Sequence, residues 1–83
     1  MGDVIVVFSV MPDGPGSVDL VRHELEKLKP QRLEIEPIAF GISSVKFTKV
    51  IPDKGGAIDE LEKKLSSISH VKSVAAVRIS RSL

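Results

Sequence analysis

Apolar and polar positions follow two different periods along this chain, and together the periods predict four strands and two helices. Residues 3–11 form an almost unbroken apolar run that is rich in β-branched side chains and ends at Pro12. A run of this kind is typical of a strand with apolar side chains on both faces. We therefore expect residues 3–11 to form a central strand of a sheet.

Two later segments have the period of an amphipathic helix. In each of them, four apolar residues follow one another at spacings of 3, 4 and 3, which places them on one stripe. Ser17 is placed to cap the first helix, and that helix must end before Pro30. In the second helix, acidic residues come first and lysines later, as the helix dipole favours. The apolar stripes consist of Val18, Val21, Leu25 and Leu28 in the first helix and of Ile58, Leu61, Leu65 and Ile68 in the second.

Two strands are predicted between the helices. Residues 33–36 alternate between apolar and charged side chains, and Pro37 limits their ladder hydrogen bonds, so we expect an edge strand. Residues 42–51 are expected to form a long strand. The adjacent apolar residues at its end, Val50 and Ile51, break the alternation and indicate a twist or a bulge.

The last strand is predicted over residues 74–79, and residues 80–83 are expected to form a free tail. The order strand, helix, strand, strand, helix, strand is that of the α+β ferredoxin-like βαββαβ sandwich. In this fold two helices cover one face of a four-stranded antiparallel sheet, and we expect residues 1–83 to form a single such domain. Because the first strand carries apolar residues on both faces, we expect the other sheet face to be covered by neighbouring side chains or used in an interface.

Length, charge and composition narrow the class of protein. A chain of 83 residues is at most one domain and buries roughly 60% of its unfolded surface. It has no cysteine, and its net charge of +1 implies no strong attraction to nucleic acid or an anionic membrane. No secretion signal is visible, and the apolar run at residues 4–10 is too short to span a bilayer. We therefore expect a cytoplasmic protein that binds neither nucleic acid nor membrane.

Phe40 differs from the other two aromatic residues of the chain. Phe8 and Phe47 lie inside apolar strand runs and are predicted to be core, whereas Phe40 lies beside Gly41 at a turn between two strands. The chain has no tryptophan and no tyrosine, and Gly41 has no side chain that would shield its neighbour. An apolar residue held in a loop is a plausible anchor for a protein partner.

Residue types that often carry metal, phosphate or nucleophilic chemistry form no specific motif here. His23 and His70 have no cysteine or second histidine at ligand spacing, so we expect no metal site. The glycines at residues 14–16 and 55–56 precede helices but match no nucleotide-binding fingerprint, and we interpret them as turns. The central strands carry no basic–aromatic motif for RNA. Acyl-phosphate hydrolases of this fold use a catalytic asparagine, and this chain has no asparagine. We therefore expect no enzymatic activity.

Three segments carry a resemblance to a known family. They are residues 36–42 (EPIAFGI), residues 53–62 (DKGGAIDELE) and residues 68–74 (ISHVKSV). In this combination the chain resembles archaeal elongation factor 1-beta and is similar, less closely, to the C-terminal exchange domain of the eukaryotic elongation factor 1-beta subunit. The resemblance extends over the whole chain, and its specificity comes from the combination of the segments.

The resemblance implies a role in translation. Members of the family have the ferredoxin-like fold, need no cofactor and act as guanine-nucleotide exchange factors: they bind the GTPase elongation factor 1-alpha and promote GDP release and GTP reloading. It implies that Phe40, in the turn with Gly41, docks in an apolar hollow of the GTPase. It also implies that Arg81 takes the place of a eukaryotic lysine that reaches the magnesium and phosphate region. Arg78 is the alternative, and we favour Arg81 for its distance from the chain end.

Other expectations stay open at this point. Ala57 replaces the hydroxyl residue that is usual in the family, so Gly56 or the backbone must cap the second helix. Two other functions fit the same fold: a small regulatory module that binds a metabolite at a subunit interface through the glycine turns, and a scaffold that pairs sheets. The exchange factor predicts a cationic C-terminal segment and an exposed Phe40, whereas the regulatory module predicts a concave polar pocket at a dimer seam.

Overall fold

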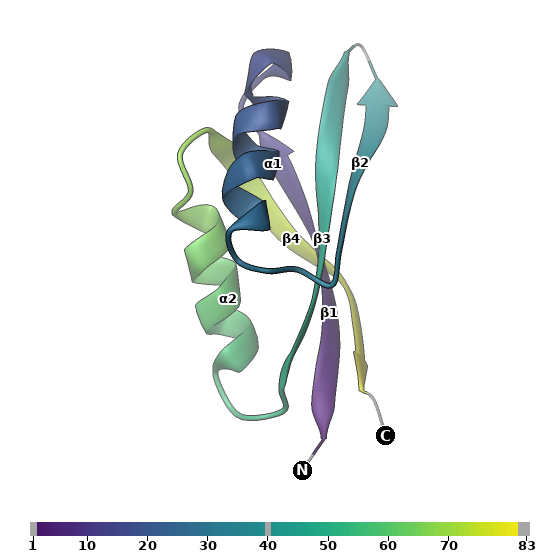
Figure 1. The fold of residues 1–83 in the computed structure, drawn as a ribbon, viewed down its shortest axis with the longest axis vertical. Helices are drawn as coiled ribbons and strands as arrows, with labels where there is room; N and C mark the ends of the chain where they lie inside the picture. The colour runs from purple at the N-terminus through teal and green to yellow at the C-terminus, as the bar shows by residue number, and fades with distance from the viewer. Residues whose placement is uncertain (1, 40, 82–83) are drawn as a thin grey trace.

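Four strands form an antiparallel sheet in the order β2-β3-β1-β4, and two helices cover one of its faces (Figure 1). This computed structural model describes residues 2–39 and 41–81. The arrangement confirms the predicted ferredoxin-like α+β fold. Neither helix in this part of the chain has the length and apolar character needed to cross a membrane.

The elements are β1 (Asp3–Pro12), a short 3₁₀ helix (Pro15–Ser17), α1 (Val18–Glu26), β2 (Arg32–Ala39), β3 (Ile42–Pro52), α2 (Ala57–Ser66) and β4 (Val71–Arg81).

β1 is a central strand, as its apolar run predicts. It pairs with β3 on one side and with β4 on the other. The β1–β3 register runs without a shift from Asp3 opposite Pro52 to Val10 opposite Val45. The side chains of β1 are alternately buried under the helices and half-buried on the other face. The apolar character of both faces therefore follows from the place of β1 inside the sheet.

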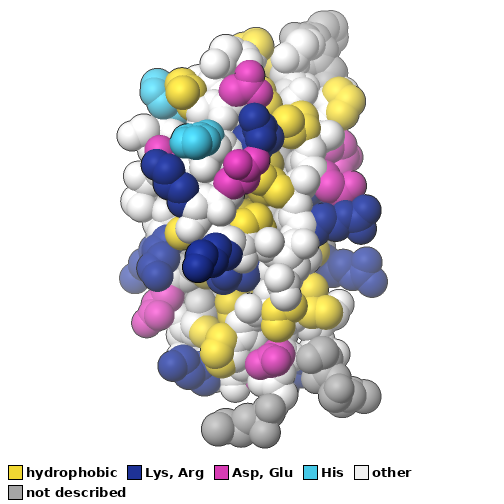
Figure 2. Space-filling view, viewed as in Figure 1, with side chains coloured by type: hydrophobic (Ala, Val, Ile, Leu, Met, Phe, Trp, Pro, Cys, Tyr) yellow, Lys and Arg dark blue, Asp and Glu magenta, His cyan; other side chains and the backbone are white. Residues whose placement is uncertain are grey.

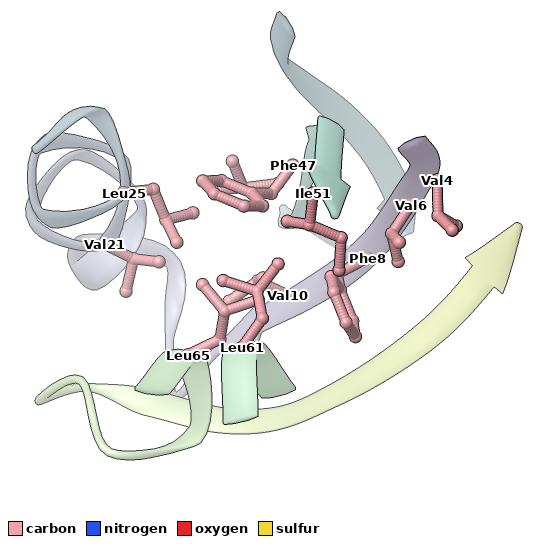
Figure 3. Close-up of a cluster of buried hydrophobic side chains, with 11 residues drawn as sticks. Val4, Val6, Phe8, Val10, Val21, Leu25, Phe47, Ile51, Leu61 and Leu65 are labelled. Carbon is pink, nitrogen blue, oxygen red and sulfur yellow. The ribbon is translucent and has the colours of Figure 1, made fainter. Parts of the chain in front are cut away.

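The core lies between the sheet and the two helices. The even-numbered side chains of β1 meet the apolar stripes of α1 and α2 there, and the aromatic rings of Phe8 and Phe47 are fully buried, as predicted. Aromatic side chains of this size dominate the energetics of a small core. Figure 3 shows the buried set, which consists of Val4, Val6, Phe8, Val10, Val21, Leu25, Val45, Phe47, Ile51, Leu61 and Leu65.

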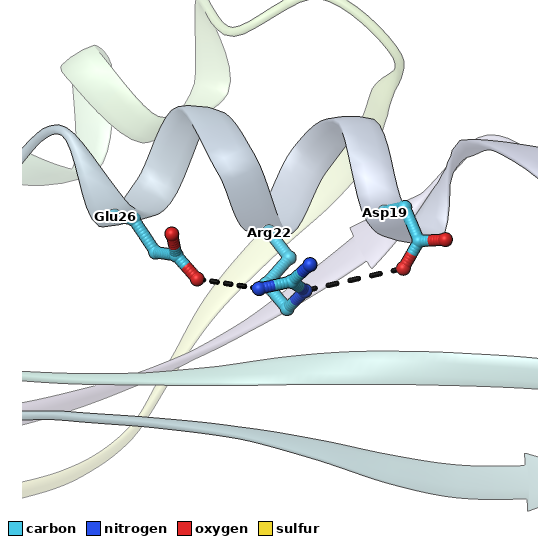
Figure 4. Close-up of polar contacts among 3 residues, drawn as sticks. All are labelled: Asp19, Arg22 and Glu26. Atoms are coloured by element: carbon cyan, nitrogen blue, oxygen red, sulfur yellow. Dashed lines mark hydrogen bonds and ion pairs between the residues drawn. The ribbon is translucent and has the colours of Figure 1, made fainter.

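α1 begins without the predicted hydroxyl cap. Ser17 stands at the N-cap position, but its side chain makes no hydrogen bond to the helix, because its hydroxyl donates to the carboxylate of Asp13 instead. The prediction that Ser17 caps the helix is therefore wrong. On the exposed side of α1, Arg22 lies between Asp19 and Glu26 and forms an ion pair with each (Figure 4). Pairs at these spacings each stabilise a helix by about 0.2–0.5 kcal/mol.

The chain just after α1 is held by a lysine of the sheet. The ammonium of Lys49 in β3 donates to the carbonyl oxygens of Leu28 at 2.9 Å and Lys29 at 3.2 Å. Lys49 lies on the same face of β3 as the buried Ile51. The apolar alternation of β3 is thus interrupted by one lysine and then continues. A twist or a bulge was predicted at the end of this strand, and the bulge is absent, because the β1–β3 register shows no shift at Val50.

The register shifts of the sheet lie elsewhere. In the β1–β4 pair, Val7 is opposite Arg78 and Phe8 is opposite Ala76, so Val77 is an extra residue that forms a bulge. β2 pairs only with β3, which confirms it as an edge strand, and its register shifts near Pro37. β2 and β4 both extend further than their apolar patterns predict.

The face opposite the helices carries the half-buried side chains of β1 and several ion pairs. Arg32 lies 3.2 Å from Glu34, and Lys46 lies 2.7 Å from Glu36. The Glu36 carboxylate raises the pKa of the Lys46 ammonium above its usual value. Figure 2 has the view of Figure 1, which does not look onto this face; it shows charged side chains along both sides of the molecule and hydrophobic side chains between them.

Candidate functional site

The turn between β2 and β3 lies at one end of the molecule (Figure 1). Gly41 has a φ of 75° there, and nothing lies within 4 Å of the position that a Cβ would take. The backbone conformation, and not the packing, therefore requires glycine at this position. Phe40, the predicted anchor, lies outside the described residues, and its docking role stays a prediction.

Isoleucines flank this turn without being buried. Ile38 is 53% exposed and Ile42 is 43% exposed, and Ile35 further back on β2 is also exposed. Several exposed branched side chains at one end of a small protein form an apolar surface of the kind that partners use. Phe40 was predicted here from the sequence, whereas the exposed isoleucines were not. For Ile35 and Ile38 the signal in the sequence was the edge strand, because an edge strand has a sheet neighbour on one side only.

Arg81 lies at the end of β4 and not in a free tail. Its backbone is paired with Val4 of β1, and Ser80 is paired with Ile5. The Arg81 guanidinium donates through Nη1 to Oδ2 of Asp53 at 2.9 Å. The prediction of a free tail is therefore wrong for Ser80 and Arg81, since both continue the ladder with β1. The Arg81 side chain is nevertheless 76% exposed.

A shallow hollow surrounds this arginine. Its walls come from the end of β4, the turn after β3 and the first turn of α2. Gly56, with a φ of 85°, is the N-cap of α2, and its carbonyl accepts from the Glu60 amide at 2.9 Å. The helix thus begins with no side-chain cap, as the alanine at position 57 predicts. The hollow is lined by Asp53, Lys54, Gly55, Gly56, Ile58, Asp59, Ile79 and Arg81.

Arg78 lies on the opposite face of the sheet. It is paired with Val7, whose side chain lies on the open face, whereas Arg81 is paired with Val4, whose side chain is buried under the helices. Arg78 lines a hollow of the open face together with Lys46. The two candidate arginines are therefore in different surroundings.

The hairpin turn and Arg81 are at opposite ends of the molecule, whose longest dimension is 42 Å (Figure 1). β3 begins beside Gly41 and ends at Pro52, next to the partner of Arg81. A strand of that length spans roughly 35 Å. A single partner must therefore be large enough to meet both ends if both take part in binding.

The two histidines make no metal site within residues 2–39 and 41–81, where no group of three His, Cys, Asp or Glu side chains could hold an ion. His70 instead lies beside Asp13, with Nδ1 at 3.3 Å from Oδ2, and the Asp13 amide donates to the His70 carbonyl at 2.8 Å. The hydroxyl of Ser17, and with a smaller effect His70, lowers the pKa of the Asp13 carboxyl below its usual value. This cluster joins the turn after β1 to the turn before β4.

Residues 5–81 match the sequence pattern of the family described as the EF-1 guanine nucleotide exchange domain. The chain belongs to this family. The match covers most of β1 and the whole of the other three strands and both helices, so the resemblance predicted from three short segments is confirmed over nearly the whole chain. Gly41, Arg78 and Arg81 lie inside the matched range.

Archaeal proteins named elongation factor 1-beta are similar to this member of the exchange-domain family along almost their whole length. That of Methanosphaerula palustris is 40% identical over 76 residues, which cover 87% of this chain and 88% of the relative. That of Methanoregula boonei is 31% identical, with 95% and 96% covered. That of Methanothermobacter thermautotrophicus is 33% identical, with 98% of each chain covered.

Proposed function

We propose that this protein is a guanine-nucleotide exchange factor that binds the GTPase elongation factor 1-alpha and speeds the release of GDP. The observation that carries the proposal is the match of residues 5–81 to the exchange-domain family. The similarity to archaeal elongation factor 1-beta over nearly all of both chains supports it. The partner and the activity are inferred from what the family resemblance implies.

Exchange of this kind requires no covalent chemistry. In a GTPase the bound Mg²⁺ offsets the charge of the nucleotide phosphates, so metal and nucleotide hold each other in place. A protein that binds the nucleotide-free state more tightly than the loaded state shifts the GTPase toward release. The protein therefore acts through differential affinity, with no cofactor of its own and not as an enzyme.

Arg81 is the residue that we propose for the magnesium region. Its guanidinium is permanently charged and 76% exposed at the end of β4. A cation in the place of Mg²⁺ compensates part of the phosphate charge but does not reproduce the octahedral coordination of the metal. Nucleotide affinity then falls. Arg78 is the less favoured candidate. It lies on the opposite face of the sheet from Arg81, because Arg78 is paired with Val7 and Arg81 with Val4, and these two residues of β1 face opposite sides.

The hairpin end supplies the second contact in this proposal. Phe40 is proposed to enter an apolar hollow of the GTPase, and the exposed Ile38 and Ile42 provide an apolar surface at the same end of the molecule. Aromatic anchors with apolar neighbours are typical of binding hot spots. Gly41 provides the backbone conformation that the turn needs.

A GDP-release assay tests this function. Elongation factor 1-alpha from an archaeon is loaded with fluorescent GDP, and release into excess unlabelled nucleotide is followed with and without this protein at catalytic concentration. We expect faster release, with the gain reduced as Mg²⁺ is raised, because metal and arginine compete. If an archaeal elongation factor 1-alpha that is matched to this protein releases GDP at the same rate with and without it, the proposal is contradicted.

A further inference from the structure

We infer that Asp53 is a positioning residue for Arg81: it holds the guanidinium over the end of β1, in the orientation in which Arg81 meets an anionic site on a partner. The inference rests on the proposed exchange function and adds to it a residue that the family resemblance does not assign. It starts from the ion pair between Arg81 Nη1 and Asp53 Oδ2 at 2.9 Å.

The backbone on both sides of this ion pair is fixed. Val4 of β1 pairs with Arg81 on one side and with Ile51 of β3 on the other, so β1 lies between β4, which carries Arg81, and β3, which leads into the turn that carries Asp53. Neighbouring strands lie about 4.8 Å apart, and Arg81 therefore reaches across β1 to the turn after β3. The Asp53 amide also donates to the Gly2 carbonyl at 3.1 Å, which fixes the turn at this point.

The ion pair leaves most of the guanidinium available. Arginine has five N–H donors, and the hydrogen bond that the Arg81 guanidinium makes among residues 2–39 and 41–81 is the one from Nη1 to Asp53. A phosphate or carboxylate group of a partner is thus able to bind the remaining donors while the aspartate keeps its contact.

The surroundings leave the arginine open to approach. Gly55 and Gly56 line the same hollow and have no side chain there. Nothing lies within 4 Å of the position that a Cβ would take at either glycine, so the space beside them is open. Asp53 is itself only 33% exposed, whereas Arg81 is 76% exposed. The carboxylate therefore lies behind the cation and the cation faces outward.

The physical gain is conformational. A free arginine side chain loses rotamer entropy when it is fixed in one place. Asp53 restricts the side chain before the partner binds, so less entropy is lost in the complex. Since the hairpin end provides a separate contact about 35 Å away, loss of Asp53 is expected to affect the maximal exchange rate and not the concentration needed for docking.

The experiment measures GDP release from elongation factor 1-alpha over a range of concentrations of this protein, giving a maximal rate and a half-saturating concentration. Asp53→Ala and Asp53→Asn should lower the maximal rate about two- to five-fold, the range for an exposed ion pair, with an unchanged half-saturating concentration. Asp53→Glu should restore most of the rate. Asp19→Asn on the exposed side of α1 makes the same change in net charge as Asp53→Asn and should leave the rate unchanged.

A double-mutant cycle separates positioning from a structural effect. In an Arg81→Gln background, Asp53→Asn should have no further effect, because the aspartate acts through the arginine. Losses that multiply in the double variant would overturn the inference, as would an unchanged or faster rate for Asp53→Asn alone. If the wild-type protein does not speed GDP release from the GTPase, the proposed exchange function is wrong. If the wild-type protein does speed release and the Asp53 variants speed it equally, the exchange function stands and the positioning role of Asp53 is wrong.

Discussion

Two arginines three residues apart in β4 have opposite surroundings. Arg81 lies on the helix side of the sheet and contacts Asp53, whereas Arg78 lies on the open face, where it lines a hollow together with Lys46. Sequence spacing alone left both as candidates for the magnesium region. The strand geometry separates them, because alternate residues of a strand point to opposite faces.

This difference leads to a prediction at single positions. Arg81→Ala should slow GDP release at least tenfold, because it removes the charge that acts at the phosphates. The melting temperature should fall by only a few degrees, since an exposed ion pair contributes about 0.2–1 kcal/mol. Arg81→Lys should recover part of the rate. Stopped-flow release with fluorescent GDP measures the rate, and thermal unfolding measures the stability.

Arg78→Ala is the companion variant and should keep nearly the full exchange rate. Full activity in Arg81→Ala together with a large loss in Arg78→Ala would reverse the assignment and place the acting cation on the open face of the sheet. An unfolded Arg81→Ala variant would instead show that the end of β4 contributes more to folding than an exposed pair does.

At the scale of elements, apolar periodicity was enough to predict the order of strands and helices, the central place of β1 and the edge place of β2. It failed where polar groups decide the outcome. Ser17 does not cap α1 because its hydroxyl is bonded to Asp13. β4 continues past its apolar run because Ser80 and Arg81 still have ladder partners in β1.

The candidate site was predictable in its chemistry but not in its contacts. The cationic end and the glycine turns are visible in the sequence. The pairing of Arg81 with Asp53 joins residues 28 positions apart, and no local spacing indicates it. The same holds for Lys49, whose contacts with Leu28 and Lys29 depend on how α1 packs against β3.

Lys49 supports a prediction about α1. Lys49→Met keeps most of the aliphatic stem but removes the ammonium that binds two carbonyl oxygens after the helix. We expect a loss of about 1 kcal/mol in the free energy of unfolding, measured by urea denaturation, because those carbonyls lose a charged donor. Lys49→Arg should recover much of it. A Lys49→Met protein as stable as wild type would show that water replaces the ammonium at no cost.

The turn that contains Asp13 supports a prediction about pH. The Ser17 hydroxyl and His70 lower the pKa of Asp13 below its ordinary value of 3.8. A carboxyl whose pKa is lower in the folded state stabilises the fold above its unfolded pKa, and this contribution is lost as the pH falls through the folded value. Asp13→Asn should therefore be less stable than wild type near neutral pH, and the difference in melting temperature should shrink as the pH falls below 3.8. A difference that is constant across this range would exclude the ionised carboxylate as its cause.

The whole molecule is long and narrow, with its two proposed contacts at opposite ends. Its dimensions are 42 × 21 × 18 Å. The hairpin end offers exposed isoleucines and no charge of its own between Pro37 and Ile42, while the other end carries the ion pair of Asp53 and Arg81. The two ends are thus chemically distinct, and we expect them to have separable roles in docking and in exchange.

Phe40→Ala tests this separation. It should weaken binding to elongation factor 1-alpha by about 2 kcal/mol, the size of a hot-spot residue, with little change in melting temperature. In the release assay the half-saturating concentration should rise while the maximal rate changes little, the reverse of the pattern expected for Arg81→Ala. Titration calorimetry with the GTPase measures the affinity. A variant that melts several degrees lower and binds normally would show that Phe40 belongs to the core.

The extra residue at Val77 determines which face of the sheet each later side chain of β4 takes. Val74 lies opposite Val10 and Ala76 opposite Phe8, so without the bulge even-numbered positions would keep facing the helices to the end of β4. The bulge transfers that face to Ile79 and Arg81. Pairing Val77 in a regular ladder would leave the sequence unchanged and yet exchange the faces of every side chain beyond it, the arginines included, whereas deleting Val77 would keep Arg78 opposite Val7 and Arg81 opposite Val4. The chemistry at the C-terminal end thus depends on the register of the ladder as much as on which residues are present.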